Sequence, residues 1–495
     1  MKIVSQMKKY SILTCVGLVL SINMLIADVR LPQIFSDGMV LQRNQPIAIW
    51  GWADPGEQVS VGFKDQRRQV TADGSGKWKL LLSPEEAGGP FELVVSGNNT
   101  ITLTDVLIGE VWVCSGQSNM EWNVANSDRA EQEIAGANYP QIRHVKIPRK
   151  TAGTAQEDIS EPLTWKEANP ANVGEFTAVG YFYARELHNE LNVPIGLINT
   201  SWGGTIVETW ISKEALEKDK SLKKAVSVYE AIPADTIQKN TNPNRYPTLL
   251  FNAMINPLIP YTIKGAIWYQ GESNAGRAYE YRKSFPMMIK DWRKRWGLGD
   301  FPFYFVQLAS FKAAGGTSAT GSTWAELREA QHLTLSLPRT GEAVTIDIGN
   351  TDDIHPRNKQ DVGKRLAGIA LHDSYGRNVV YSGPVYQKHK VKGPEVTVYF
   401  DHVHGGLTAQ GGGKVIGFEV AGADQQFYPA EATIAGKTVV VRSSSVSKPK
   451  AIRYAWADDP STSNLFNREG FPACPFRTDH WEPVTKGAIY ELKGN

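Results

Sequence analysis

The sequence contains few cysteines and no block of like charge, and both shortages limit what the protein can be. Three cysteines in 495 residues exclude a fold held together by a disulfide framework. Lysine and arginine (53) nearly balance aspartate and glutamate (51), so there is no electrostatic basis for binding nucleic acid. No cysteine pair or H-E-x-x-H spacing is present, and we therefore expect no metal ligands.

Long apolar runs are also scarce, and the one exception lies at the N-terminus. Lys2, Lys8 and Lys9 precede an almost uninterrupted apolar stretch over 10–26, which ends at Ala27 before Asp28. This order is typical of a secretory signal peptide over 1–27, with a retained membrane anchor as the alternative. Loss of three lysines would change the formal charge from +2 to −1. We expect a secreted or periplasmic protein with no stable membrane insertion after cleavage.

The length exceeds what one hydrophobic core usually supports, so several domains are expected. Residues 28–105 combine short runs of β-branched and aromatic residues with Gly, Asp and Asn turns, a pattern typical of a small β-sandwich. Residues 376–495 have the same texture and predict a second β domain. The strands expected in the two regions are 46–50, 58–63, 78–82, 91–96 and 100–103, and 379–381, 395–399, 414–420 and 438–442.

Between them, residues 106–375 alternate apolar strands with amphipathic helices, which predicts an α/β fold with a doubly wound parallel sheet. The polar stretch 213–246 fits this alternation poorly and is expected to cross the rim of the active site. The predicted strands are 111–114, 195–198, 263–269, 303–307 and 343–348. The predicted helices are 177–191, 286–296 with Pro286 in its first turn, 324–337 and 359–370. Cys114 lies in the first of these strands, so we expect Cys114 and Cys474 to be free, buried thiols.

Unusual polar loops follow four of the predicted strands. They read Ser-Gly-Gln-Ser-Asn-Met from 115, Ser-Trp-Gly-Gly-Thr from 201, Gln-Gly-Glu-Ser-Asn from 270, and Thr-Asp-Asp-Ile-His-Pro from 351. In doubly wound sheets, ligands bind at the carboxyl ends of parallel strands. We therefore expect the four loops to converge on one site.

These loops contain the groups that acyl transfer requires. Ser118 follows a glycine in a strand-to-helix turn and is the candidate nucleophile, although the closing glycine of G-x-S-x-G is missing. His355 is the candidate general base, oriented by Asp352 or, failing that, by Asp353. The oxyanion would be stabilised by the Ser118 N–H, an N–H of Gly203 or Gly204, and the Asn274 amide. Each residue alone has an ordinary structural explanation, and the hypothesis rests on their joint occurrence.

The motifs Gly-Gln-Ser-Asn-Met, Ser-Trp-Gly-Gly-Thr, Gln-Gly-Glu-Ser-Asn and Asp-Ile-His-Pro together resemble the sialate O-acetylesterase family of SGNH hydrolases. The resemblance implies Ser118 as nucleophile, His355 as base, and Asn274 with one of the two glycines in the oxyanion hole. Asp352 occupies the acid position of the Asp-x-x-His motif, although some relatives orient the histidine with backbone carbonyls. It also implies that neither a metal nor an organic cofactor is needed.

The resemblance further implies hydrolysis of O-acetyl groups on sugars, with sialic acids as the expected glycan substrate. Residues in or beside the loops are the candidates for binding it: Gln117, Trp202, Glu208 and Gln270. Acetylated xylan or xyloglucan is an alternative substrate, and a catalytically silent carbohydrate-binding protein is an alternative of another class. A metal-dependent hydrolase using Asp347, Asp352, Asp353 and His355 is disfavoured because these residues lack the spacing of a known metal motif.

Overall fold

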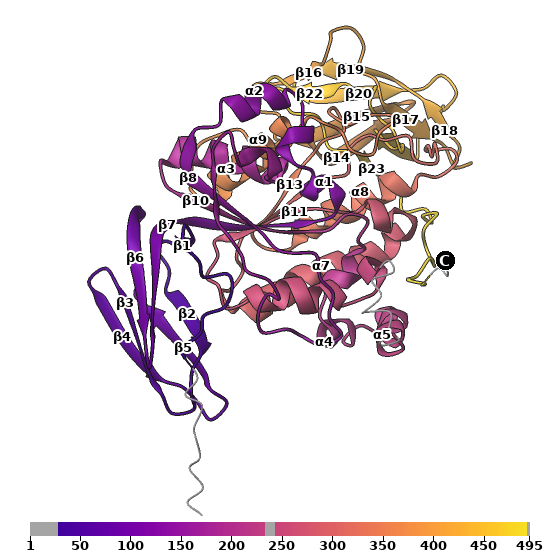
Figure 1. Ribbon diagram of the computed structural model, residues 1–495. Coiled ribbons are helices and arrows are strands. Elements are labelled where there is room, and N and C mark those ends of the chain that lie inside the picture. The colour runs from indigo at the N-terminus through magenta and orange to yellow at the C-terminus, as the bar shows by residue number, and fades with distance from the viewer. Residues whose placement is uncertain (1–27, 233–242, 493–495) are drawn as a thin grey trace, which may run out of the picture.

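The computed structural model describes residues 28–232 and 243–492. The predicted signal peptide, 1–27, lies outside the described residues. Three regions follow one another along the chain: an N-terminal group of strands, a central α/β region, and a C-terminal group of strands on the far side (Figure 1). Among the described residues, no helix combines the length and apolar character needed to cross a membrane.

The central region contains the predicted parallel sheet. Its strand order is β13-β12-β11-β7-β10-β8-β9, and every neighbouring pair is parallel except β8 and β9. The expected α/β class is thereby confirmed. The strands are β7 (Thr100–Gly116), β8 (Tyr139–Lys146), β9 (Lys166–Ala168), β10 (Ile195–Ser201), β11 (Gly265–Tyr269), β12 (Phe303–Val306) and β13 (Thr340–Ala343).

Apolar residues on both faces of these strands bury the sheet between two layers of helices. Along β7, Val111 and Val113 pack into one core, whereas Trp112 and Cys114 pack into the other, as expected for side chains that alternate along a strand. Cys114 and Cys474 are free, buried thiols, as predicted. Helices α7 (Ala278–Trp296) and α8 (Thr323–Leu333) cover one face, and α3 (Ala178–Leu191) and α9 (Lys359–Asp373) cover the other.

Side-chain caps fix where several helices begin. Thr177 accepts a hydrogen bond from the Gly180 N–H at the start of α3, and Ser322 accepts one from Ala325 at the start of α8. Each cap satisfies a backbone N–H that has no partner within its helix. Four shorter helices are α1 (Ser118–Glu121), α2 (Ala130–Ala135), α4 (Lys213–Leu216) and α5 (Lys223–Glu230).

Several of the predicted boundaries are wrong, among them that of the strand predicted at 414–420, which is observed at Phe418–Ala421. Helix α7 begins at Ala278, so Pro286 lies inside it rather than in its first turn; buried Tyr281 and Phe285 pack the preceding turns onto the sheet. The strand predicted at 343–348 is instead β13 at Thr340–Ala343. The apolar residues that suggested the later position, Val344 and Ile346, pack into the C-terminal core.

Most of the N-terminal strands are continuous with the central sheet, whereas β2 and β5 form a separate two-stranded sheet. β7 pairs with β6 through its first residues and with β10 and β11 through its last, so it crosses the predicted boundary at residue 105. Their apolar side chains form one core with those beneath α7. The strands are β1 (Val40–Gln42), β2 (Ile47–Trp52), β3 (Gln58–Phe63), β4 (Gln66–Thr71), β5 (Lys77–Leu82) and β6 (Gly88–Ser96).

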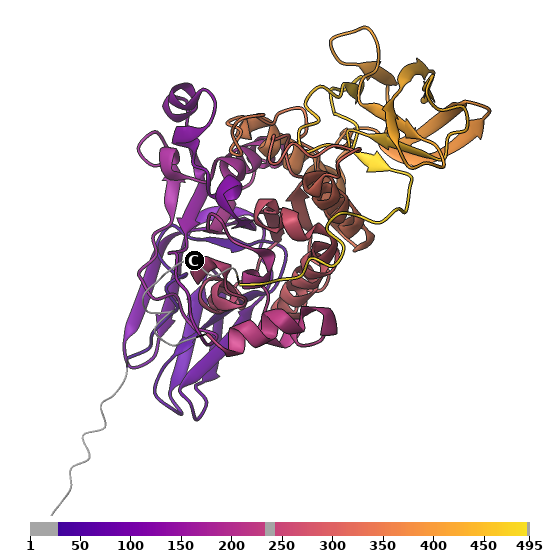
Figure 2. The same cartoon turned by 90° about the vertical axis from the view of Figure 1, so that its right-hand side faces the viewer.

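The C-terminal strands surround a separate core, and the view in Figure 2 shows them standing apart from the rest of the molecule. The chain then returns, and Thr485 and Tyr490 contact Glu326 and Glu280 of the central region. The predicted strand 379–381 is irregular. The strands are β14 (Val385–Lys392), β15 (Glu395–Asp401), β16 (Leu407–Ala409), β17 (Phe418–Ala421), β18 (Phe427–Pro429), β19 (Glu431–Ala435), β20 (Thr438–Arg442), β21 (Ala451–Tyr454), β22 (Leu465–Asn467) and β23 (Phe476–Arg477).

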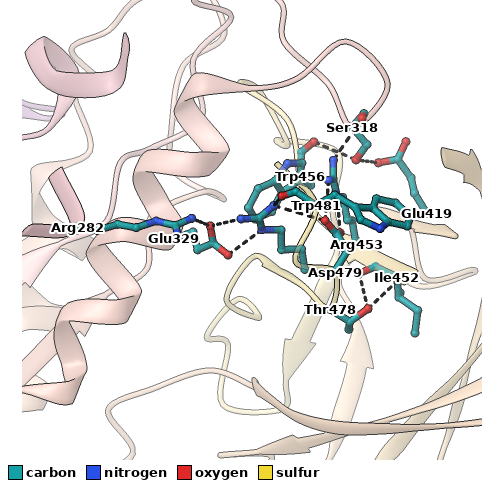
Figure 3. A network of polar contacts seen from close by, with 11 residues as sticks. Arg282, Ser318, Glu329, Glu419, Ile452, Arg453, Trp456, Thr478, Asp479 and Trp481 are labelled. Carbon is teal, nitrogen blue, oxygen red and sulfur yellow. Dashed lines mark hydrogen bonds and ion pairs between the residues drawn. The ribbon is translucent and has the colours of Figure 1, made fainter. Parts of the chain in front are cut away.

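A network of ion pairs attaches the C-terminal strands to α7 and α8. The Glu329 carboxylate, on α8, accepts from Arg282 of α7 and from Arg477 of β23, the latter at 2.8 and 3.0 Å. Asp479 in turn accepts from Arg453 at 3.0 and 3.1 Å (Figure 3). These bidentate contacts fix the orientation of the junction.

Candidate active site

Ser118 lies at a sharp turn between β7 and α1. Gly116, the last residue of β7, has a φ of +134°, and a side-chain carbon there would lie 2.1 Å from the Tyr269 carbonyl oxygen. Only glycine fits this position. The Gln117 N–H donates to the same oxygen at 2.9 Å, which fixes the turn against β11 and leaves Ser118 half-buried at the carboxyl end of the sheet.

The structure brings His355 to Ser118. The His355 Nε2 lies 2.8 Å from the Ser118 Oγ, although the residues are 237 positions apart. Burial lowers the pKa of His355, and the charge of Lys359 lowers it further, whereas Asp353 opposes both. The imidazole is therefore neutral near pH 7 and can accept the serine proton. The Trp122 ring stacks on the imidazole at a centroid distance of 5.0 Å.

The carboxylate beside His355 belongs to Asp353 rather than to the predicted Asp352. Asp353 Oδ1 accepts from the His355 backbone N–H at 2.8 Å and lies 3.6 Å from Nδ1. Asp352 is exposed, and its own N–H donates to Asn350. Which aspartate lies beside the imidazole depends on how the loop bends after residue 350. The spacing of residues along the sequence does not reveal that bend.

Asn119, the residue after Ser118, holds the histidine loop in place. Its Nδ2 donates to Glu272 at 2.6 Å and to the Ile354 carbonyl at 3.0 Å. Its Oδ1 accepts from Lys359 Nζ at 2.7 Å, and Lys359 also donates to the Pro356 carbonyl at 2.6 Å. Sequence reasoning missed this network, although Asn119 and Glu272 lie inside the motifs that it singled out.

Burial perturbs both charged members of this network. It lowers the pKa of Lys359 to about 7 and raises the pKa of Glu272. Desolvation penalises each charged form, and the facing opposite charge offsets only part of that penalty. The Lys359 charge is therefore sensitive to pH in the neutral range.

Of the two predicted glycine donors, Gly203 lies against the serine. A side-chain carbon at Gly203 would be 3.3 Å from Ser118 Cβ. Its N–H donates to Glu121 Oε2 at 3.0 Å, and the Glu121 carboxylate also accepts from Arg149. Gly204 has a φ of +72°, and a side-chain carbon there would approach Asn244 instead.

Asn274 is buried behind these loops and fully oriented by its neighbours. Its Oδ1 accepts from Val207 N at 2.9 Å and from Gln270 Nε2 at 2.7 Å. Its Nδ2 donates to Glu208 Oε2 at 3.1 Å. Burial raises the pKa of Glu208, but the charge of Arg277 and the hydrogen bonds from Arg277, the backbone and Asn274 together lower it by more, so Glu208 is ionised.

Three of the four predicted substrate-binding residues are buried. Gln117, Glu208 and Gln270 are at most 3% exposed, and their polar atoms bond to the protein. These three side chains are therefore placed to position the loops rather than to contact a sugar. Trp202 is half-buried, with the Arg149 guanidinium 5.9 Å from its ring, and is open to a ligand.

A cavity of about 620 Å³ adjoins these loops. Gly204 and Ser273 line it on the side of the candidate site, and the C-terminal segment 487–492 lines it on the other. Two guanidinium groups contribute to its wall, those of Arg245 and Arg277. Arg277 forms ion pairs with Glu208 and Glu280, and Arg245 is exposed.

Comparison with known proteins identifies the family. Residues 108–372 match the family described as carbohydrate esterase, sialic acid-specific acetylesterase. The mouse sialate O-acetylesterase is 32% identical over 415 residues, covering 72% of this chain and 76% of its own. The chain belongs to this family of carbohydrate esterases. It is an ester hydrolase, and the resemblance inferred from the motifs is confirmed.

Other relatives of the esterase extend the similarity to its whole fold. The human sialate O-acetylesterase is 34% identical over 394 residues, covering 72% of this chain and 74% of its own. The crystal structure of a carbohydrate acetylesterase from Xanthomonas citri is 46% identical, with a TM-score of 0.85, and covers 92% of this chain and 100% of that one. The central α/β sheet and both groups of β-strands therefore have counterparts in a solved structure.

The structure gives no support to the alternative of a metal site built on Asp347 and the histidine loop. Both Asp347 oxygens accept from Arg365, at 2.7 and 2.6 Å. Asp352 and Asp353 are exposed on the loop, and His355 faces the serine of the esterase. These groups serve the loop and the serine rather than a common ion.

Proposed function

We propose that the esterase uses Ser118 as its nucleophile and removes O-acetyl groups from sialic acids. The observation that supports the mechanism is the 2.8 Å contact between Ser118 Oγ and His355 Nε2. A serine and a neutral histidine at hydrogen-bond distance form the pair that acyl transfer requires.

The proposed reaction has two steps. Ser118 Oγ attacks the acetyl carbonyl carbon while its proton passes to His355 Nε2, and the carbonyl oxygen becomes an oxyanion. The bond to the sugar oxygen then breaks, and His355 returns the proton to that oxygen. In the second step, His355 takes a proton from water, the resulting hydroxide attacks the acyl-serine, and acetate leaves as Ser118 regains its proton.

Three donors are assigned to the oxyanion: the Ser118 N–H, the Gly203 N–H and the Asn274 side-chain amide. Gly203 is favoured over Gly204 because it lies against Ser118. Its N–H donates to Glu121 at present, and a bound acetyl oxygen would replace that carboxylate. Asn274 is held rigidly by Val207, Gln270 and Glu208, so its amide needs little reorganisation during the reaction.

The proposal of sialic acid as substrate rests on the relatives and on the adjoining cavity. The mouse and human relatives are named sialate O-acetylesterases. Sialic acid carries a carboxylate, and a guanidinium recognises a carboxylate through two parallel hydrogen bonds. Arg245 is the group assigned to this contact, because Arg277 is already paired with Glu208 and Glu280.

The test compares an anionic substrate with a neutral one. We expect Arg245→Gln to raise KM for O-acetylated sialic acid by roughly tenfold, which corresponds to about 1.4 kcal/mol, and to leave KM for a neutral aryl acetate unchanged. Arg442→Gln, on strand β20 of the C-terminal region, is the matched control. Acetate release from acetylated xylan but not from sialic acid would reject this substrate and retain the serine mechanism.

Export belongs to the same proposal. The basic and apolar start of the chain supports signal-directed secretion to the periplasm or beyond, where acetylated glycans are accessible. Fractionation of cells that express the full chain should place the protein outside the cytoplasm, with an N-terminus at or near Asp28 by mass spectrometry. A protein that keeps Met1–Ala27 and stays in the cytoplasm would contradict this expectation.

A further inference from the structure

Three side chains that can bind a metal meet at the junction with the C-terminal strands. His332 lies near the end of α8, Glu342 lies on the edge strand β13, and Cys474 precedes β23. Their ligand atoms all lie within 4.8 Å of one another. We propose that these residues bind a divalent transition-metal ion, with zinc as the expected ion, which fastens the C-terminal β region to the esterase domain.

The spacing of the donors fits such an ion. His332 Nδ1 lies 2.8 Å from Glu342 Oε2 and 3.5 Å from Cys474 Sγ, and the sulfur lies 3.8 Å from the same carboxylate oxygen. With zinc–sulfur bonds of about 2.3 Å and zinc–nitrogen bonds of about 2.0 Å, the edges of a tetrahedral site measure roughly 3.3–3.6 Å. Movements of a few tenths of an ångström would centre an ion between the three groups.

A fourth polar side chain faces the same point. Gln307 is fully buried, and its Nε2 donates to Glu342 Oε1 at 3.0 Å and to Cys474 Sγ at 3.4 Å. Its Oε1 has no hydrogen-bond partner among the described residues, which is costly for a buried acceptor. Rotation of this amide by half a turn would bring the oxygen to the cluster as a fourth ligand. The His332 side chain is 32% exposed, so water has access as well.

The donor set selects the kind of ion. A thiolate and an imidazole favour zinc and similar transition metals, whereas calcium and magnesium prefer oxygen ligands. The Glu342 carboxylate and a Cys474 thiolate together carry two negative charges, which a divalent ion neutralises in a largely buried place. Binding would release the thiol proton, since the thiolate is the form that binds metal.

A metal ion at this site would stabilise the fold and would take no part in the esterase reaction. Its residues come from the catalytic region and from the C-terminal segment, so an ion would join them as the Glu329–Arg477 pair does elsewhere on α8. An ion that binds only the folded chain stabilises it in proportion to its occupancy. Zinc should therefore raise the melting temperature without a change in the esterase mechanism.

The experiment uses the full chain without a histidine tag, freed of metal by a chelator and then dialysed against Zn²⁺. We expect one zinc per chain by mass spectrometry of the metal content, and a melting temperature at least about 2 °C higher than without zinc. Co²⁺ in place of Zn²⁺ should give thiolate charge-transfer absorption. Cys474→Ser should lose all three signals, and Cys114→Ala, at the other buried thiol, should retain them.

Histidine variants keep the test decisive if Cys474→Ser folds poorly. His332→Gln changes a partly exposed side chain and should abolish zinc binding, whereas the exposed His480→Gln should not. Equal zinc content and equal thermal response in wild type, Cys474→Ser and His332→Gln would overturn the proposal. So would the absence of bound zinc in the wild type, which would leave an ion pair between His332 and Glu342. These readouts need no substrate and are independent of the proposed function.

Discussion

His355 and His332 are both partly buried, yet their surroundings give them opposite affinities for a proton. Burial, aided by Lys359, lowers the pKa of His355, and its nearest carboxylate lies 3.6 Å from the ring. The facing sulfur of Cys474, together with Glu342, raises the pKa of His332 to about 12 despite burial. His355 is therefore neutral and able to accept a proton, whereas a metal ion bound at His332 would have to replace the proton that Cys474 and Glu342 favour.

The largest expected effect concerns the pair at the carboxyl edge of the sheet. Ser118→Ala and His355→Ala should each lower kcat for acetate release by at least about 10⁴-fold, because nucleophile and base act as one unit. His332→Ala, at the junction, should leave kcat within about threefold. Melting curves would establish that all three variants fold. Activity retained by Ser118→Ala would show that Ser118 and His355 are not the catalytic pair, and the contrast with His332 would then fail.

The next effect concerns the oxyanion. Asn274→Ala should lower kcat by roughly 10²–10³-fold with little change in KM, because the lost amide acts mainly in the transition state. Steady-state kinetics on a soluble acetyl ester would measure both constants. A variant with normal kcat would show that Asn274 only supports Glu208 and Gln270.

The two adjacent aspartates offer a matched pair. Asp353→Asn should lower kcat/KM by about tenfold, because a neighbouring charge that stabilises the imidazolium contributes on the order of 1 kcal/mol near the surface. Asp352→Asn should remain within about twofold, since Asp353 is the carboxylate that lies beside the ring and raises the pKa of His355. A larger loss in Asp352→Asn would restore the assignment made from the Asp-x-x-His motif.

The pH profile should show the lowered pKa of His355. Because the neutral imidazole is the active form, kcat/KM should fall as pH drops through a midpoint below about 6.5, the ordinary histidine value. Lys359→Met removes a positive charge that lowers the pKa of His355, so the midpoint should move upward. Asp353→Asn should move it downward. Shifts of the opposite sign would contradict the assigned environment.

The smallest effect on catalysis is expected at the junction. Chelation of the purified esterase should lower its melting temperature by a few degrees and leave kcat unchanged. Measuring the melting temperature and kcat on the same chelated sample would show whether the metal affects stability without affecting catalysis. A loss of activity that zinc restores would show that the junction and the active site are coupled.

Much of the fold was predictable because its signals are local. Buried strands such as Ile195–Ser201 read as apolar runs, and the alternation of strands with helices predicts the parallel sheet. β8 was missed because Arg143 and His144 interrupt its apolar residues, although both are buried. The end of β13 was misplaced because the apolar residue Ile346, which suggested a longer strand, packs into the core of the C-terminal strands.

The candidate site was predictable only in its residue types. Four strand-end loops supplied Ser118, Gly203, Asn274 and His355, and the structure gathers them at one edge of the sheet. The choice of Asp353, the clamp between Asn119 and Lys359, and the burial of Glu208 depend on loop geometry and tertiary contacts. The junction cluster joins residues up to 142 positions apart and has no signal in sequence spacing.

The most direct test of the central claim is acetate release by the purified protein from O-acetylated sialic acid, with Ser118→Ala and acetylated xylan measured in parallel. The account predicts release from the sialic acid by the wild type and none by Ser118→Ala. Release that persists in Ser118→Ala, or no release from either glycan or from an aryl acetate, would contradict it.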